Sequence, residues 1–175
     1  MDEPNPRFLE IFFEIFESLP RQGPGNLASA RKALRLCKNL PETLEILDLG
    51  CGTGSQTLQL AELTQGSIIA VDNHAPSIEK LNQKLAQLSL TNCIRAEVGD
   101  MAELTMAQSS FDLIWSEGAL YNIGIQRALS ISASLLRNGG YLVFTDAVWC
   151  KDNLPDAVKA IFESNYLAMG TVANL

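Results

Sequence analysis

Three glycines stand at alternate positions just after an acidic residue that interrupts an apolar run. They are Gly50, Gly52 and Gly54 in the stretch EILDLGCGTGSQTLQLA, residues 45–61, and Asp48 precedes them. Glycine permits a sharp turn and a close approach of the backbone to a ligand, so the stretch predicts a strand-to-helix turn at a binding site. Such a turn can serve a dinucleotide, a nucleotide phosphate or an adenosyl cofactor, and it also occurs as a purely structural tight turn.

The residues around the glycines argue against both phosphate ligands. Ser55 stands where the third glycine of a dinucleotide-binding GxGxxG motif is needed for helix–strand packing. The Gly-Lys-Ser/Thr ending of a P-loop is absent from the sequence. The negative charge of Asp48 suits a cation and repels a pyrophosphate. A nicotinamide-dependent oxidoreductase is therefore the least favoured alternative.

Further polar side chains end the later apolar runs, namely Asp72, Asp100, and Ser116 with Glu117. The carboxyl ends of parallel strands meet at one edge of a sheet, so we expect these groups to line a single crevice. Asp72 follows Gly50 by 22 residues, the spacing of an acid that accepts hydrogen bonds from ribose hydroxyls. The alternative role for Asp72 is to cap a helix that begins just after it.

Short apolar runs alternate with segments of helical spacing after residue 41. The expected strands are 44–50, 67–72, 93–100, 111–117 and 140–148. The expected helices between them are 55–65, 75–90 and 122–140, and residues 101–110 are only weakly helical. This alternation predicts an α/β fold, a doubly wound parallel sheet with helices on both faces.

Two further segments with helical spacing precede the sheet, over residues 6–20 and 27–40, with a Gly/Pro loop at 21–26 between them. The first is apolar beyond a single stripe, so it must be covered by the domain, a partner or a substrate. We therefore expect an N-terminal helical extension or lid over residues 1–40 and a binding domain over residues 41–175.

Composition narrows the classes of partner. The 175-residue chain has a net charge of −7 and no block of Lys or Arg, which argues against nucleic acid. No window approaches the roughly 20 apolar residues of a membrane span, and no signal peptide is evident. The four cysteines form no CxxC pair, so we expect neither a metal site nor disulfides, but free thiols in a cytoplasmic protein.

The motifs together carry a family resemblance. ILDLGCGTGSQTLQLA resembles the first motif of class I S-adenosylmethionine-dependent methyltransferases, and AVDNH, VGDM, FDLIWSEGALYNIG and LLRNGGYLVFTD resemble the later motifs. The resemblance spans residues 26–148 and is closest to small-molecule enzymes of the ubiquinone/menaquinone-biosynthesis type. RQGPG with SEGALYNIG also resembles a bacterial methyltransferase group. The resemblance implies a Rossmann-like fold, S-adenosyl-L-methionine as cofactor and a small-molecule methyl acceptor.

The resemblance also implies how the methionine part of the cofactor is bound. Asp48 would help to hold its amino group, directly or through water, and Ser116 and Glu117 would lie beneath the sulfonium and methionine portion. The methionine moiety would lie against four residues of the turn: Gly50, Cys51, Gly52 and Gly54. Cys51 is interpreted as a small turn residue and not as a nucleophile.

Four positions would bind the adenosine part, by the same resemblance. Asp72 would accept from the ribose hydroxyls, with Asn73 beside the adenine. Asp100 would accept from the adenine amino group, and Met101 would pack on the ring.

Methyl transfer is an in-line displacement that depends on alignment and needs no nucleophilic residue or metal. A base is needed only when the acceptor carries a proton, and Tyr121 and His74 are the candidates. For His74, the sole histidine, a solvated or adenine-side position is favoured. Arg21, Tyr121 and Asn122 are candidates to face the acceptor, each with surface or packing roles as an equal alternative.

The readable strands depart from the family pattern in one respect. Class I methyltransferases usually have seven strands, whereas five are readable here, so the C-terminal strand pair is expected to be missing and the chain truncated. We expect residues 140–148 to form an apolar sheet edge, covered by the tail or by a second copy in a homo-oligomer. A second functional hypothesis follows, a cofactor-binding module without turnover.

Overall fold

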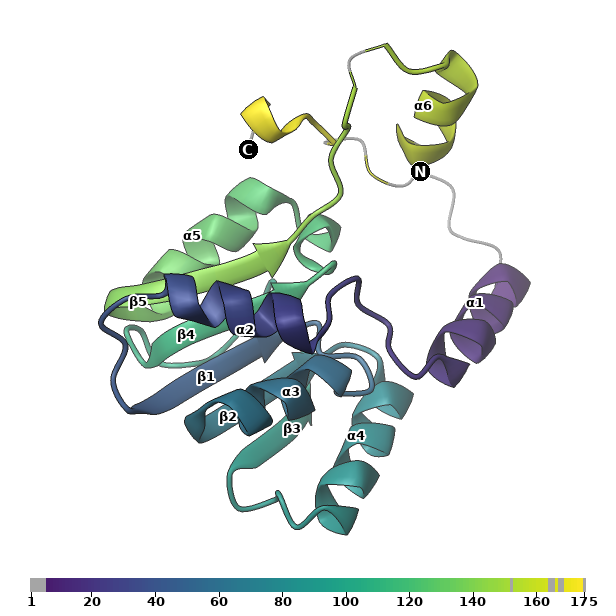
Figure 1. Cartoon of the computed structure of the whole chain (residues 1–175). Coiled ribbons are helices and arrows are strands. Elements are labelled where there is room, and N and C mark those ends of the chain that lie inside the picture. The colour runs from purple at the N-terminus through teal and green to yellow at the C-terminus, as the bar shows by residue number, and fades with distance from the viewer. Residues whose placement is uncertain (1–5, 152, 164–165, 167–168, 175) are drawn as a thin grey trace.

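The computed structural model describes residues 6–151, 153–163, 166 and 169–174 (Figure 1). Five parallel strands form one sheet in the order β3-β2-β1-β4-β5, which confirms the predicted doubly wound fold. The strands are β1 (Thr43–Leu49), β2 (Gln65–Asp72), β3 (Ile94–Val98), β4 (Phe111–Glu117) and β5 (Leu136–Thr145). The strand order reverses between β1 and β4, so the switch point of the fold lies between these two strands.

Helices cover both faces of the sheet. α2 (Leu27–Leu36), α3 (Ser55–Leu63) and α4 (Ala75–Gln87) pack on one face, where Leu60 and Leu81 are fully buried. Figure 1 shows α2 and α3 in front of the sheet and α5 behind it. The strands are therefore covered on both sides, which explains their nearly continuous apolar sequences.

The second face packs against α5 (Ile125–Leu135) through Ala128 and Leu135. Successive residues of β1 alternate between the two cores, with Ile46 in the first and Leu47 in the second. The short helix η1 (Leu120–Asn122) follows β4 and also contributes to the second core.

Several boundaries differ from the sequence prediction. β5 begins at Leu136, within the segment expected to be helical, because Leu136 pairs with Phe111 across an irregularity in the register. Residues 101–110 form turns and loop and no helix. α2 ends at Leu36 and begins after a capping box in which the Asn26 side chain accepts from the Ser29 amide at 2.9 Å.

The N-terminal helix α1 (Pro6–Ser18) stands beside the edge formed by the carboxyl ends of the strands (Figure 1). The expected division at residue 40 falls after α2, whose Ala30 belongs to the first core. Residues 1–5 of the expected extension, and residues 152, 164, 165, 167, 168 and 175 of the expected binding domain, lie outside the described residues. The two-part organisation stays a prediction.

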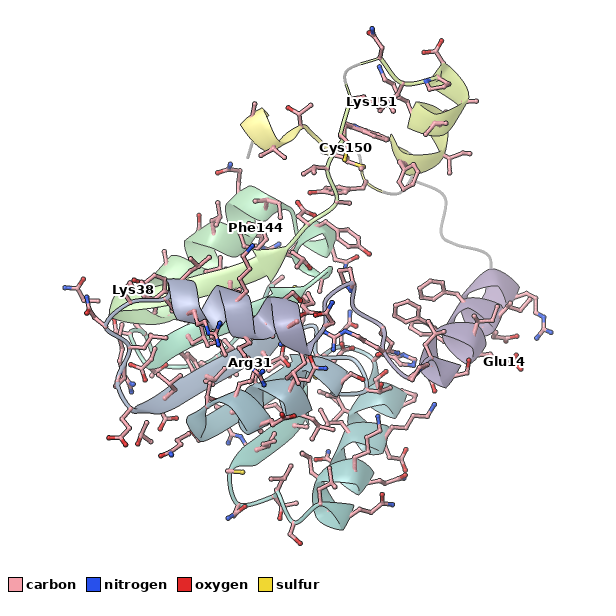
Figure 2. All side chains as sticks on the ribbon, viewed as in Figure 1. Glu14, Arg31, Lys38, Phe144, Cys150 and Lys151 are labelled. Carbon is pink, nitrogen blue, oxygen red and sulfur yellow. The ribbon has the colours of Figure 1, made fainter. Side chains whose placement is uncertain are left out.

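The described tail leaves the sheet at the end of β5, the edge strand. Figure 2 shows Phe144 near that end and Cys150 and Lys151 on the segment that leads to α6 (Asp156–Glu163). The bridge recorded for this tail joins Trp149 to Thr171, before η2 (Val172–Asn174), and does not involve β5. Tail coverage or self-association at this edge stays a prediction. In the described part of the chain, no helix is long and apolar enough to cross a membrane.

Candidate functional site

A cavity of about 470 Å³ opens at the carboxyl-end edge of the sheet, beside the switch point between β1 and β4. Ligands of open parallel sheets bind in this position, and the volume lies in the range of small-molecule sites. The cavity is bounded by the glycine turn, the ends of β2 and β4, the loop after β3, η1, α1 and the loop that follows α1. Most predicted cofactor positions line it: Asp48, Gly50, Cys51, Gly52, Asp72, Asn73, Asp100, Met101 and Glu117.

Two predicted cofactor positions are placed outside the cavity lining. Gly54 precedes α3 with φ +82°, and a side-chain carbon there would lie 2.1 Å from Leu81 Cδ1, so this glycine serves the packing of α4. Ser116 is fully buried and its hydroxyl donates to the Leu49 carbonyl at 2.8 Å, which links β4 to β1.

The backbone amides of the glycine turn, residues 50–54, all donate to acceptors within the protein. The first two donate to the Val71 carbonyl at 2.8 and 3.1 Å, and the third donates to Asp72 Oδ2 at 2.8 Å. The fourth donates to Gln22 Oε1 at 2.8 Å and the fifth to the Cys51 carbonyl at 2.9 Å. Anion-binding turns present free N–H groups, so this turn does not fit a phosphate.

Asp48 is a buried carboxyl at the base of the cavity, 1% exposed, and accepts from Thr57 Oγ1 at 2.7 Å. Burial raises its pKa to about 7, and the charges of Glu117 and Asp72 also raise it, while the Thr57 hydrogen bond lowers it. A positive ligand beside this carboxyl would offset the cost of its charge. The site therefore favours a cation.

Asp72, at the end of β2, accepts backbone hydrogen bonds on both oxygens, from the Gly52 amide at 2.8 Å and from the His74 amide at 2.9 Å. The N-cap of α4 is His74, so the structure contradicts the alternative in which Asp72 caps this helix. Each carboxylate oxygen has a second lone pair for a ligand hydroxyl. The half-buried Asp72 thus fixes the turn and faces the cavity.

His74 joins the cavity wall to α1. Its ring stacks on Phe13 with centroids 3.9 Å apart and an interplanar angle of 3°. Its Nε2 lies 2.6 Å from Glu17 Oε1, and Glu17 also pairs with Lys80. Hydrogen bonds from Lys80 and His74 lower the pKa of Glu17. His74 therefore lies beside Asp72 in the cavity wall and holds α1, and its adenine-side role stays a prediction.

We call residues 20–25, between α1 and α2, the strap. Within it, Arg21 Nη2 pairs with Glu117 Oε2 at 2.5 Å, and the Gly25 amide donates to the same oxygen at 3.2 Å. A side-chain carbon at Gly23 or Gly25 would lie 2.8 or 2.5 Å from the Glu117 carboxylate. The strap can wrap around Glu117 only because both positions are glycine.

The strap also binds the first turns of α3. Arg21 donates to Gln56 Oε1 at 2.7 Å and to Gln59 Oε1 at 3.0 Å. The Ser55 hydroxyl donates to the Pro20 carbonyl at 2.7 Å. The N-terminal segment is thus fastened to the strand-to-helix turn that the sequence motif encodes.

Aromatic side chains also line the cavity. Phe12, Phe13 and Phe16 of α1 line it, together with Tyr121 and Asn122 after β4. The candidate acceptor residues Arg21, Tyr121 and Asn122 therefore all reach the cavity.

Tyr121 lies at the boundary between the cavity and the described tail. It is 37% exposed and packs on Tyr166 with ring centroids 5.2 Å apart. The Tyr166 hydroxyl donates to Asp146 at 2.6 Å, and burial raises the pKa of Tyr166.

Sequence reasoning missed several residues of the site. Gln22 and Gln56 were not predicted as site residues, although each lies within a motif, RQGPG for Gln22 and ILDLGCGTGSQTLQLA for Gln56. The phenylalanines of α1 belong to a segment whose excess of apolar residues did predict a covering partner. Gly118 and Ala119 line the cavity directly after β4, where the SEGALYNIG motif gave the available signal.

Comparison with known proteins supports one family. Residues 41–173 match the family model described as a methyltransferase domain. The chain is 30% identical over 135 residues to a sarcosine/dimethylglycine N-methyltransferase from Aphanothece halophytica, a match that covers 75% of this chain and 48% of that protein. A trans-aconitate 2-methyltransferase from Deinococcus radiodurans is 41% identical over 78 residues, which are 43% of this chain and 27% of that protein.

A solved structure of similar fold matches most of the chain. It is an S-adenosylmethionine-dependent methyltransferase from Thiobacillus denitrificans in complex with S-adenosyl-L-homocysteine, with a TM-score of 0.79 at 21% identity. The match covers 99% of this chain and 68% of that chain. The chain spans about half the length, or less, of the curated relatives described above. From the family match over residues 41–173, the chain belongs to the methyltransferase domain family.

Proposed function

We propose that this chain binds S-adenosylmethionine in the cavity and catalyses methyl transfer to a small-molecule acceptor. The observation that carries the proposal is the composition of the cavity wall. The glycine turn has no free amide to offer a phosphate. Beside it lie the buried carboxyl of Asp48, which favours a cation, and the carboxylate of Asp72 at the end of β2. That combination suits a positively charged adenosyl cofactor better than a nucleotide.

The described residues fit both ends of this cofactor. Asp72 offers its remaining lone pairs to ribose hydroxyls, and Asn73, Asp100 and Met101 line the same part of the cavity. Asp48, whose pKa is raised by burial, suits the positive end. These roles are proposals that rest on the lining and on the family.

Bound S-adenosylmethionine supplies a methyl carbon that its sulfonium already activates. The protein's part is to position and to exclude water, and such positioning contributes roughly 7–11 kcal/mol to a barrier. The aromatic side of α1 would shield the acceptor from solvent, and Tyr121 is the favoured proton-accepting group for an acceptor that needs one. His74 is the weaker candidate, because its Nε2 is engaged by Glu17.

Calorimetry tests the cofactor directly. We expect S-adenosylmethionine and S-adenosylhomocysteine to bind with Kd on the order of micromolar, about 8 kcal/mol, and NAD not to bind. Binding of NAD alone would overturn the proposal.

Turnover is tested with cofactor-loaded protein incubated with metabolite fractions, with mass detection of an added methyl group. A gain supports the enzyme. Binding with no gain in any fraction favours the alternative, a cofactor-binding module without turnover.

We propose a neutral or cationic acceptor with an apolar body. Four carboxyl groups line the cavity, namely Asp48, Asp72, Asp100 and Glu117, and would repel an anion. The aromatic side chains of α1 suit an apolar body, including the rings of ubiquinone-type acceptors. In a panel of matched acceptors with and without a carboxylate, we expect the uncharged members to be methylated faster.

Three coarser expectations are also proposals. Residues 1–40 would serve as a cover for the cavity, supported by the strap contacts and by the contact of α1 with His74. The protein would work in the cytoplasm, consistent with four free cysteines. Self-association would occur through β5, and sedimentation with a Lys substitution on that edge would test it.

A further inference from the structure

Helix α2 and the residues just after it carry a cluster of cations in an otherwise acidic chain. Residues 27–38 contain four of the 13 Lys and Arg residues and no Asp or Glu. The remaining residues carry nine Lys or Arg against 20 Asp or Glu. The formal charge is therefore +4 over this segment and −11 over the rest of the chain. A local reversal of charge of this kind attracts a partner of opposite sign.

The fold gathers most of these cations on the exposed side of α2. Ala30 is buried in the first core, whereas Arg31, Lys32 and Arg35 are exposed on the other side of the helix. Figure 2 shows Arg31 on α2, in front of the sheet. Leu36 lies one helical turn after Lys32 and is 68% exposed. We call Arg31, Lys32, Arg35 and Leu36 the α2 surface.

The cations of the α2 surface form no ion pair with any described residue. Elsewhere in the chain, Lys80 and Arg137 each pair with a carboxylate. Arg31 and Lys32 stand four and three residues before Arg35, so like charges are neighbours along the helix. Such neighbours destabilise a helix, and α2 has no acidic residue to offset them. The carboxylates of a partner would relieve this repulsion.

The stability of α2 explains only part of the cluster. Arg35 lies in the last turn, where a cation interacts favourably with the helix dipole. Lys38 Nζ donates to the Arg35 carbonyl at 2.8 Å, at the end of the helix. Arg31 and Lys32 lie in the middle of α2 and have neither role. Their charges point to a contact with another molecule.

The size of the α2 surface favours a protein helix over a nucleic-acid duplex or a lipid bilayer. α2 has ten residues and is therefore about 15 Å long. A duplex or an anionic bilayer would extend beyond it and meet the acidic remainder of the chain. An acidic helix of similar length would meet the cations alone, and an apolar side chain on it would cover Leu36.

We propose that the α2 surface binds an acidic amphipathic helix of a partner protein. The carboxylates of that helix face the three cations, and its apolar side chain packs on Leu36. The partner is held next to the cavity, because Gly25, two residues before α2, donates to Glu117 in the cavity wall. The inference goes beyond the proposed function and does not depend on it.

A synthetic helical peptide with Glu on one face and Leu on the other is the probe. The same peptide with Lys in place of Glu is its control and should not bind. Amide NMR shifts of the full chain should change on titration with the Glu peptide, most strongly over residues 27–38. Binding should weaken about tenfold between about 0.05 M and about 0.5 M salt, because salt screens exposed charges.

Charge reversal tests whether the α2 surface is the binding site. Lys32→Glu should weaken binding of the Glu peptide about fivefold to tenfold, and Leu36→Ser should weaken it by less. Lys151→Glu is the matched control, because Lys151 is exposed in the tail (Figure 2) and the change in net charge is the same. Lys151→Glu should leave binding unchanged within about twofold.

Arg31→Glu distinguishes a partner surface from a structural role. It should weaken binding of the Glu peptide while raising the midpoint of thermal unfolding by about 1–3 °C, because the new carboxylate stands one turn before Arg35. A structural role for Arg31 would instead lower that midpoint. The same unfolding measurement shows that each variant is folded.

Three results would overturn the inference. Equal weakening by Lys32→Glu and Lys151→Glu would show attraction by net charge alone. Tighter binding of a DNA duplex or of phosphatidylglycerol vesicles than of the Glu peptide would contradict a protein partner. Self-association of the wild type that Lys32→Glu abolishes would assign the α2 surface to a second copy of the chain. Failure to bind S-adenosylhomocysteine would overturn the proposed function and leave this inference standing.

Discussion

The glycine turn and α1 bound the same cavity but are held in different ways. The turn is fixed by five backbone donors and rests on buried residues such as Asp48 and Leu49, each 1% exposed. On α1, Phe12 is 42% and Ile15 60% exposed, and polar contacts of Glu17 and the strap fasten it. The turn side of the cavity is therefore part of the folded core, whereas the α1 side can move or change at small cost.

The strongest test of the buried turn is the pH dependence of stability. The pKa of Asp48 is about 7 in the folded chain and about 4 when unfolded, so the folded state binds the proton more tightly. Its stabilising contribution is full below pH about 4 and is lost as pH rises to about 7, by up to about 4 kcal/mol. In urea unfolding, the free energy of unfolding of Asp48→Asn relative to that of the wild type should therefore rise steadily over this pH range. A difference that does not vary with pH would contradict the assignment.

Gly50→Ala tests whether the backbone conformation and close packing of the turn require glycine. A side-chain carbon at Gly50 would lie 2.3 Å from Ala119 Cβ, and φ is +71°. We expect the free energy of unfolding to fall by about 3 kcal/mol, from strain and steric overlap together. Gly124→Ala is the control, since φ is +80° there with no atom within 4 Å, and should lose about 1 kcal/mol. Equal losses in the two variants would show that the contact with Ala119 relaxes freely.

Asp72→Ala should weaken both cofactor binding and the unliganded fold. Its side chain accepts hydrogen bonds from two backbone amides, which the substitution leaves without this partner. We expect the free energy of unfolding to fall by about 2 kcal/mol and the affinity for S-adenosylhomocysteine to fall about tenfold to several hundredfold. The exposed Asp156→Ala on α6 should do neither. Unchanged thermal unfolding of Asp72→Ala would mean that water replaces both bonds.

Phe12→Ala should have the smallest effect on folding. The side chain is 42% exposed, so we expect a loss below about 1 kcal/mol. Cofactor affinity should hold while the KM for the acceptor rises, once an acceptor is known. Phe162→Ala on α6, with Phe162 47% exposed, is the matched control. A fall in cofactor affinity for Phe12→Ala alone would show that the two sides of the cavity are not separable.

Local pattern predicted the strands and many of the residues that line the cavity, because each motif lies on one strand and the turn that follows it. The start of β5 at Leu136 could not be read locally, since it depends on pairing with Phe111. Neither could the Glu17–His74 contact, which joins residues far apart in sequence. The burial of Ser116 could have been predicted, because neighbouring side chains in a strand point to opposite faces and only one of Ser116 and Glu117 can face the cavity. Glu117 is the one that lines it.

The strap was the least predictable part of the site. Gln22 accepts from the Thr53 amide and Arg21 pairs with Glu117, contacts that require the folded sheet to exist first. Gly23 and Gly25 predicted a loop from the sequence. They did not predict that this loop closes around the carboxylate of Glu117. Glycines thus show where a chain can turn, but they do not show which distant residue the turn will contact.

The fully engaged amides of residues 50–54 also bear on competition inside a cell. Adenine nucleotides are abundant metabolites that share the adenosine half of the proposed cofactor. Their phosphates would meet a turn that offers no hydrogen bond, next to the carboxyl groups of Asp48 and Glu117. The hydrogen bonds that hold the turn would therefore also discriminate against ATP. The site could then remain free of a large excess of ATP without a residue dedicated to excluding it.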